Sequence, residues 1–185
     1  MQTNHLKLLA MLFIFLPALL LTTGCDRDND NEPENEQELI TTVTLTFTPT
    51  AGGSAIVATA KDLDGDGGNP PVVQDIELAA NTDYTLAISF LDESKNPVEN
   101  ITEEVEEESN EHLVCLVGSG AMPSPTIQDT DDNGKPLGLR SSFKTGAAGN
   151  GTLKVTLKHE ADKSAASPCA TGETDAEQTF NVTVK

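Results

Sequence analysis

The chain has 185 residues and a formal net charge of −19 at pH 7, from 30 acidic and 11 basic residues. A field of this sign repels nucleic acids and anionic lipids, which excludes nucleic-acid binding, and it attracts divalent cations or basic partners. Aromatic residues make up 4% of the chain and tryptophan is absent, so a core must be built mainly from Val, Ile, Leu and Ala.

Residues 1–24 are typical of a bacterial lipoprotein signal peptide. Lys7 precedes an apolar run at residues 8–21, and small residues lead to Gly24 and then Cys25. The run is shorter than the roughly 20 residues that span a bilayer, and such segments direct export and are not part of the fold. We expect cleavage before Cys25 and acylation of its thiol. The alternative is an ordinary secretory peptide with an incidental cysteine, against which Gly24 argues.

Residues 25–38 form the predicted lipidated cysteine and an acidic tether. Acids alternate here with Asn, Pro and Gln, a composition that cannot bury enough apolar surface to fold. Of the 11 basic residues only Lys7 lies in the signal peptide, which has no acid, so the mature chain carries 10 basic and 30 acidic residues, a net charge of −20. We expect the tether to hold a folded domain away from a membrane that the chain does not span.

Beyond residue 38 the apolar positions repeat with a period of two. Segments 42–48, 84–90, 153–158 and 179–185 alternate in this way, and 76–78 and 137–139 are shorter versions. Each pattern predicts a strand with one apolar face, and clusters of Gly, Pro, Asn and Asp separate them. We therefore predict that residues 39–185 form one all-β domain, an immunoglobulin-like antiparallel β-sandwich of seven to nine strands.

One short helix is predicted at residues 102–109. Ile101 and Val105 are four residues apart, and Asn100 is placed to cap the helix together with Glu103. Crowded glutamates oppose a long helix, so we expect a turn or two.

The leading candidate site joins this acidic segment to two histidines. Seven acids lie between residues 99 and 111, His112 opens the next strand, and His159 ends another in phase with its apolar residues. Because strand ends of a sandwich cluster, the two imidazoles are expected to converge. With Glu108 or Glu111 they would suit Zn²⁺ or Cu²⁺. The alternative is a solvated acidic loop beside two unrelated histidines.

A second, weaker candidate is calcium binding. Two runs match the first half of an EF-hand loop and lack its second half. The predicted calcium ligands are Asp62, Asp64 and Asp66 in one run, and Asp129, Asp131 and Asn133 in the other. Hairpin turns alone are the preferred explanation of both runs, since Asp-Gly and Asn-Gly favour positive φ.

Cys115 and Cys169 are the two thiols left once Cys25 is acylated. An even number in an oxidising compartment suggests a disulfide, although Cys115 lies among apolar residues and could be a core residue. A Ser-x-x-Lys run at residues 141–144 is common by chance, and no nucleophile elbow, phosphate loop or metalloprotease helix occurs. We therefore do not expect an enzyme.

Five segments of the domain are distinctive: 61–70, 100–108, 111–112, 145–149 and 157–160. Together they resemble a family of small acidic lipoproteins of Bacteroidota, often labelled type 1 periplasmic binding fold superfamily proteins. The acidic stretch after Cys25 also resembles the surface-export signal of such lipoproteins. The label implies two α/β lobes, whereas this domain is too short and too poor in helices to cover a parallel sheet, so we retain the all-β prediction. The resemblance further implies a companion of TonB-dependent outer-membrane receptors, which import metals, metal chelates or glycans.

Together these features predict an outer-membrane lipoprotein, at the cell surface or the periplasmic face, that acts as a non-catalytic binding module. Its first expected role is to capture a divalent metal or metal chelate for a TonB-dependent receptor. The alternative is a structural or adhesive module that binds protein or glycan through a sheet face, with the acids serving only solubility.

Overall fold

The structure, a computed structural model, describes residues 39–64 and 68–185. The predicted signal peptide, Cys25 and the tether lie outside the described residues, and so does Asp66. Among the residues described, no helix has both the length and the apolar character needed to cross a bilayer.

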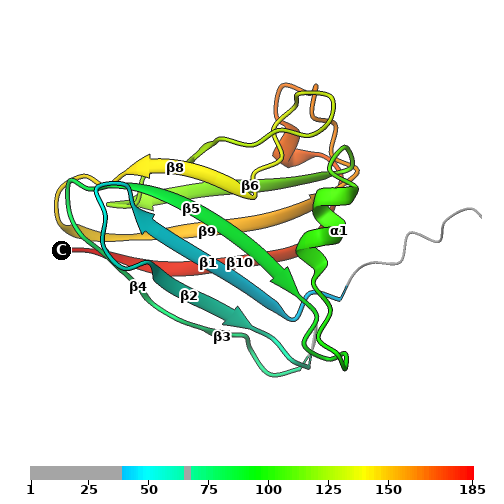
Figure 1. Ribbon diagram of the computed structural model, residues 1–185, viewed down its shortest axis with the longest axis horizontal. Coiled ribbons are helices and arrows are strands. Elements are labelled where there is room, and N and C mark those ends of the chain that lie inside the picture. The colour runs from blue at the N-terminus through cyan, green and yellow to red at the C-terminus, as the bar shows by residue number, and fades with distance from the viewer. Residues whose placement is uncertain (1–38, 65–67) are drawn as a thin grey trace, which may run out of the picture. The chain divides into compact units, whose positions relative to one another are not determined.

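Two β-sheets face each other across the apolar core (Figure 1). The first has six strands, in the spatial order β3 (Val72–Val73), β2 (Ile56–Lys61), β1 (Thr42–Pro49), β5 (Asp83–Leu91), β8 (Arg140–Lys144) and β7 (Thr126–Ile127). The second has four strands, in the order β4 (Ile76–Leu78), β10 (Glu173–Val184), β9 (Gly149–His159) and β6 (His112–Gly120).

The period of two explains how the sheets meet. In β1, Leu45 and Phe47 are fully buried while Thr46 between them is partly exposed, because successive side chains of a strand point to opposite faces. Leu45 is paired with Ile88 of β5, so apolar residues of adjacent strands share the inner face. The predicted all-β sandwich is confirmed.

The strand order from β5 onward follows the immunoglobulin scheme. In that scheme one sheet reads A-B-E-D and the other C-F-G. Here β1, β5, β8 and β7 occupy the first set of places, and β6, β9 and β10 the second. Strands β2 and β3 extend the first sheet beyond β1.

Three details of the prediction are wrong. The described residues contain ten strands rather than seven to nine, and two of these, β3 and β7, have only two residues, which is too short for an alternating pattern. The sheets are not purely antiparallel, since β4 runs parallel to β10. Residues 137–139 do not form a strand, because Gly138 has a φ of +99° and a Cβ there would lie 2.4 Å from the carbonyl oxygen of Val114.

A two-turn helix, α1 (Ile101–Glu107), joins β5 to β6. Its Ile101 and Val105 are buried, as the predicted helix requires. Asn100 occupies the N-cap position, but its side chain makes no cap hydrogen bond and donates instead to the Glu103 carboxylate at 2.8 Å, so the predicted capping is wrong.

Candidate metal centre

His112 and His159 lie opposite each other on neighbouring strands. His112 begins β6, His159 ends β9, and the two are register partners. Both side chains point to the inner face of the sheet, because each is two residues from a core residue of its strand, Val114 on β6 and Leu157 on β9. The end of the sheet that carries them lies beside α1 (Figure 1).

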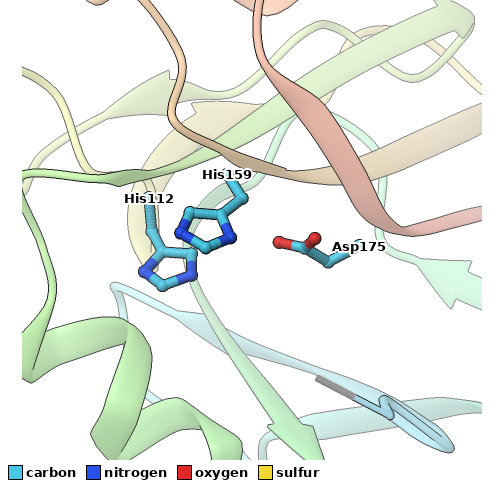
Figure 2. Close-up of side chains that lie close together, drawn as sticks. All are labelled: His112, His159 and Asp175. Carbon is cyan, nitrogen blue, oxygen red and sulfur yellow. The ribbon is translucent and has the colours of Figure 1, made fainter. Parts of the chain in front are cut away.

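Asp175 joins the pair through an irregularity in the third strand. Along β10, Thr174 pairs with Lys158 and Ala176 pairs with Leu157, so Asp175 is the extra residue of a β-bulge. A bulge bends the strand and re-aims a side chain. Figure 2 shows the resulting arrangement, in which the Asp175 carboxylate faces the two imidazoles.

The three side chains are close enough to share one ion. The imidazole centroids are 4.8 Å apart and the rings are inclined by 20°. One ligand atom from each of His112, His159 and Asp175 lies within 4.8 Å of the others. Two ligands on one ion with bonds near 2.0–2.2 Å are at most about 4.4 Å apart, so only small side-chain shifts would complete the site. The predicted convergence of the two imidazoles is confirmed.

The glutamates predicted as ligands occupy a different position. The backbone carbonyl of Glu108 lies 3.3 Å from His112 Nδ1, and the Glu111 carboxylate lies 3.5 Å from His159 Nε2. Among the described residues, the group that the structure brings together contains neither Glu108 nor Glu111. Both instead sit where metal-binding histidines commonly find a partner for their second ring nitrogen.

These outer contacts determine which nitrogens remain for an ion. A carbonyl oxygen can only accept, so His112 carries its proton on Nδ1 and presents the lone pair of Nε2. That Nε2 is buried and has no hydrogen-bond partner among the described residues. Since His159 Nε2 faces Glu111, its Nδ1 is the nitrogen left for the group.

The polar atoms of the group are left without partners inside the fold. Neither carboxyl oxygen of Asp175 accepts a hydrogen bond from the described residues, although both oxygens are buried. Burial raises the pKa of Asp175, against the effect of the two histidines. Burial, and then the nearby His159, lower the pKa of His112. A buried polar atom that lacks a partner costs stability, and a bound cation would satisfy all three side chains at once.

Asp175→Asn is expected to stabilise the metal-free protein by about 1–2 kcal/mol at neutral pH, by removing a buried, unpartnered charge. Because the pKa of Asp175 is raised on folding, its destabilising effect grows as pH rises above the ordinary value of 3.8. The gain should therefore disappear below about pH 4. Urea unfolding of both proteins across this pH range measures it, and a gain independent of pH would contradict the cause given.

The predicted calcium ligands that the structure describes are not gathered around a common centre. Asp129 accepts hydrogen bonds from the backbone of Gly138 and Arg140, while Asp131 accepts from Lys163 and from backbone N–H groups, including that of Asn133. These carboxylates are therefore used to build a turn.

In the other run, Asp64 accepts two hydrogen bonds from Asn69. One carboxyl oxygen of Asp62 is buried without a partner among the described residues. No calcium-type cluster of acidic residues is found in the described part of the chain.

Cys115 and Cys169 form the predicted disulfide, with Cα atoms 5.9 Å apart. Cys115 lies on the outer face of β6, in a small apolar cluster with Leu113 and Ala161. Cys169 lies in the short 3-10 helix η1 (Pro168–Ala170), within the connection from β9 to β10. The bond therefore ties this connection, whose ends carry His159 and Asp175, to the strand that carries His112.

A hollow of about 480 Å³ lies on the outer face of the six-stranded sheet. Residues of β1, β5 and β8 line most of it, and the larger part of the lining surface is apolar, with Leu86 and Ala87 among the residues. Hydroxyl groups come from Thr46, Thr48, Thr85 and Ser142, and Gln128 and Arg140 are also present, whereas the Ser141 hydroxyl is buried. The Arg140 guanidinium is exposed and pairs with Glu106 of α1 at 3.1 Å. The hollow is separate from His112 and His159, which lie on the inner face of the other sheet.

Comparison with protein-family models and with curated proteins finds no match to this chain.

Proposed function

We propose that the chain is a membrane-anchored lipoprotein whose β-sandwich binds one divalent transition metal without catalysis. The ligands are His112, His159 and Asp175. The observation that carries the proposal is the meeting of three ligand side chains whose inward polar atoms, His112 Nε2 and both Asp175 oxygens, lack hydrogen-bond partners in the described fold.

The donor set favours Zn²⁺ or Cu²⁺. Imidazole nitrogen suits both ions, and a carboxylate oxygen completes a mixed site of the kind that Zn²⁺ accepts. Ca²⁺ prefers six to eight oxygen ligands, which two imidazoles do not provide. The contacts from Glu108 and Glu111 to the outer ring nitrogens would orient the imidazoles and increase their basicity.

The cellular role rests on the signal sequence and on the resemblance described above. With Cys25 acylated, the domain would sit on the outer membrane, at the cell surface or facing the periplasm. There it would capture a metal or metal chelate and present it to a TonB-dependent receptor. Binding without catalysis is proposed because the sequence contains no nucleophile elbow, phosphate loop or metalloprotease helix.

Calorimetric titration of residues 26–185 with Zn²⁺ and Cu²⁺ tests the proposal, and this segment keeps the whole folded unit. We expect one ion per chain with micromolar or tighter affinity. Losing a ligand should cost more than the 10–100-fold typical of an outer contact, so His112→Gln and Asp175→Asn should each weaken binding by more than about 100-fold. Glu111→Gln should weaken it by about 10–100-fold.

The matched control is Glu107→Gln, which changes an exposed glutamate of the same acidic segment and should leave the affinity unaltered. Circular dichroism on each variant separates loss of ligand from loss of fold. Equal binding by the parent protein, His112→Gln and Asp175→Asn would show that the ion binds elsewhere on the acidic surface and would overturn the proposal.

The hollow on the outer sheet face favours a second candidate function, recognition of a glycan or protein. Its apolar lining offers a surface for packing, and Thr46, Ser142 and the Arg140 guanidinium add groups that hydrogen-bond a polyhydroxylated ligand. If no ion binds in the titration, this sheet-face function becomes the working answer, with the acids serving solubility.

A further inference from the structure

We infer that the metal centre keeps one coordination position for a small anionic ligand supplied from solution. The species bound would then be a metal that carries a monodentate anion or an anionic chelator, rather than an ion enclosed by protein alone. This inference rests on the proposed function and specifies the chemical class of its cargo.

The first step is the number of protein donors. Within the described residues the ligand group contains His112, His159 and Asp175 and no fourth His, Cys, Asp or Glu. Zn²⁺ in proteins is most often four-coordinate, and sites with three protein ligands hold an external ligand in the fourth position. A fourth donor must therefore come from outside unless a nearby glutamate moves.

The nearby glutamates are placed for other contacts. Glu111 lies against the outer nitrogen of His159, the one that faces away from the group. Glu108 contacts His112 Nδ1 through its backbone carbonyl oxygen. This contact does not bring the Glu108 carboxylate to the metal position. Glu173 is the register partner of His159, but its side chain is exposed.

The second step is charge. A divalent ion with one carboxylate and two neutral imidazoles leaves a net charge of +1. His112 is fully buried and both Asp175 oxygens are shielded from solvent, so this charge would sit in a poorly solvated place. An uncompensated charge there is costly, and an anion in the fourth position would remove it. Glu111 compensates only weakly, because its side chain is 57% exposed and screened by solvent.

The third step is access. The His159 side chain is 15% exposed, whereas His112 is 0% exposed. The inward atoms His112 Nε2 and both Asp175 oxygens are themselves buried, so the His159 side is the one that lies nearest to solvent. An external ligand would enter from that side, and the small exposed fraction there limits it to a small donor.

The experiment uses Co²⁺ as a coloured substitute for Zn²⁺ on residues 26–185, followed by titration with sodium azide and then sodium acetate. A visible cobalt spectrum that is abolished in His112→Gln tests the proposed function itself. A saturable change of that spectrum, with one anion bound per cobalt, tests the further inference. By linkage, saturating azide should tighten Co²⁺ binding by the same factor by which Co²⁺ tightens azide binding.

Glu111→Gln and Glu173→Gln are the decisive variants. If the position is open, Glu173→Gln should bind azide as the parent does. Glu111→Gln, measured at a Co²⁺ concentration that saturates its weakened site, should still bind one azide per cobalt. A parent spectrum unaffected by either anion would overturn the inference while leaving the metal site intact. An azide response seen only after Glu111→Gln or Glu173→Gln would also overturn it, because that glutamate would then be the fourth ligand.

Discussion

Replacing Lys163 by Met is expected to lower the free energy of unfolding by about 3–5 kcal/mol. Lys163 Nζ donates to Asp131 Oδ2 at 2.9 Å and to the Ser109 carbonyl at 2.6 Å. The side chains of Lys163 and Asp131 are only 5% and 2% exposed, so removing the cation leaves a buried carboxylate with its backbone N–H partners but without its counter-ion. Urea unfolding, with the slope checked for two-state behaviour, measures the loss.

The control is Lys154→Met, which breaks the ion pair with Glu177 on the surface. Those side chains are 43% and 48% exposed, and such pairs contribute about 0–1 kcal/mol. The double variant Lys163→Met with Asp131→Leu should recover much of the stability, since no lone charge remains. Equal losses in the two single variants would contradict burial as the cause.

The same pair has a defined pH dependence. Burial opposes ionisation of Asp131, but Lys163 and the backbone N–H groups outweigh it and lower the pKa of Asp131. Its stabilising effect is therefore present above the ordinary value of 3.8 and is lost as pH falls through the folded pKa.

Replacing both Cys115 and Cys169 by Ser is expected to lower the free energy of unfolding by about 3–4 kcal/mol. The bond closes a loop across a sequence separation of 54 residues, and its loss returns that freedom to the unfolded chain. Zn²⁺ affinity should fall too, because the bond fixes the β9–β10 connection between His159 and Asp175 to the strand of His112.

The measurement is urea unfolding of the oxidised protein and the double variant, with and without Zn²⁺. The parent protein treated with reductant is the matched control, since it removes the bond without changing the sequence. If reductant leaves the unfolding midpoint unchanged, the disulfide does not contribute as stated. If only the Zn²⁺ affinity is unchanged, the bond stabilises the fold without positioning the ligands.

The immunoglobulin-like sandwich was predictable because alternation is a local property. Each of the long predicted strands buries the residues that its pattern assigned inward, such as Leu45 and Phe180. The pattern failed at residues 137–139, where Leu137 and Leu139 are buried but the positive φ of Gly138 prevents an extended strand. The apolar spacing of Leu137 and Leu139 therefore predicted their burial correctly, but it did not predict the backbone conformation between them.

The candidate site was only half predictable. The alternation along its strand puts His159 in phase with the core, so its inward orientation followed from the sequence. Residues 113–117 are apolar at every position, so the sequence did not define the phase of His112. Asp175 was missed because it lies in a polar stretch of β10 and faces inward only through the bulge between Thr174 and Ala176. Glu108 and Glu111 were chosen for nearness along the chain, which does not say which ring nitrogen a neighbour reaches.

The sequence by itself determined the fold class, the inner face of each long alternating strand and the inward phase of His159, because these depend on residue type and local spacing. The tertiary structure alone decided the register that pairs His112 with His159, the bulge that adds Asp175 and whether the two cysteines meet in a bond that ties β6 to the β9–β10 connection. These depend on contacts between residues far apart in the chain. Their geometry is selected by packing of the whole sandwich and is not encoded in any one segment.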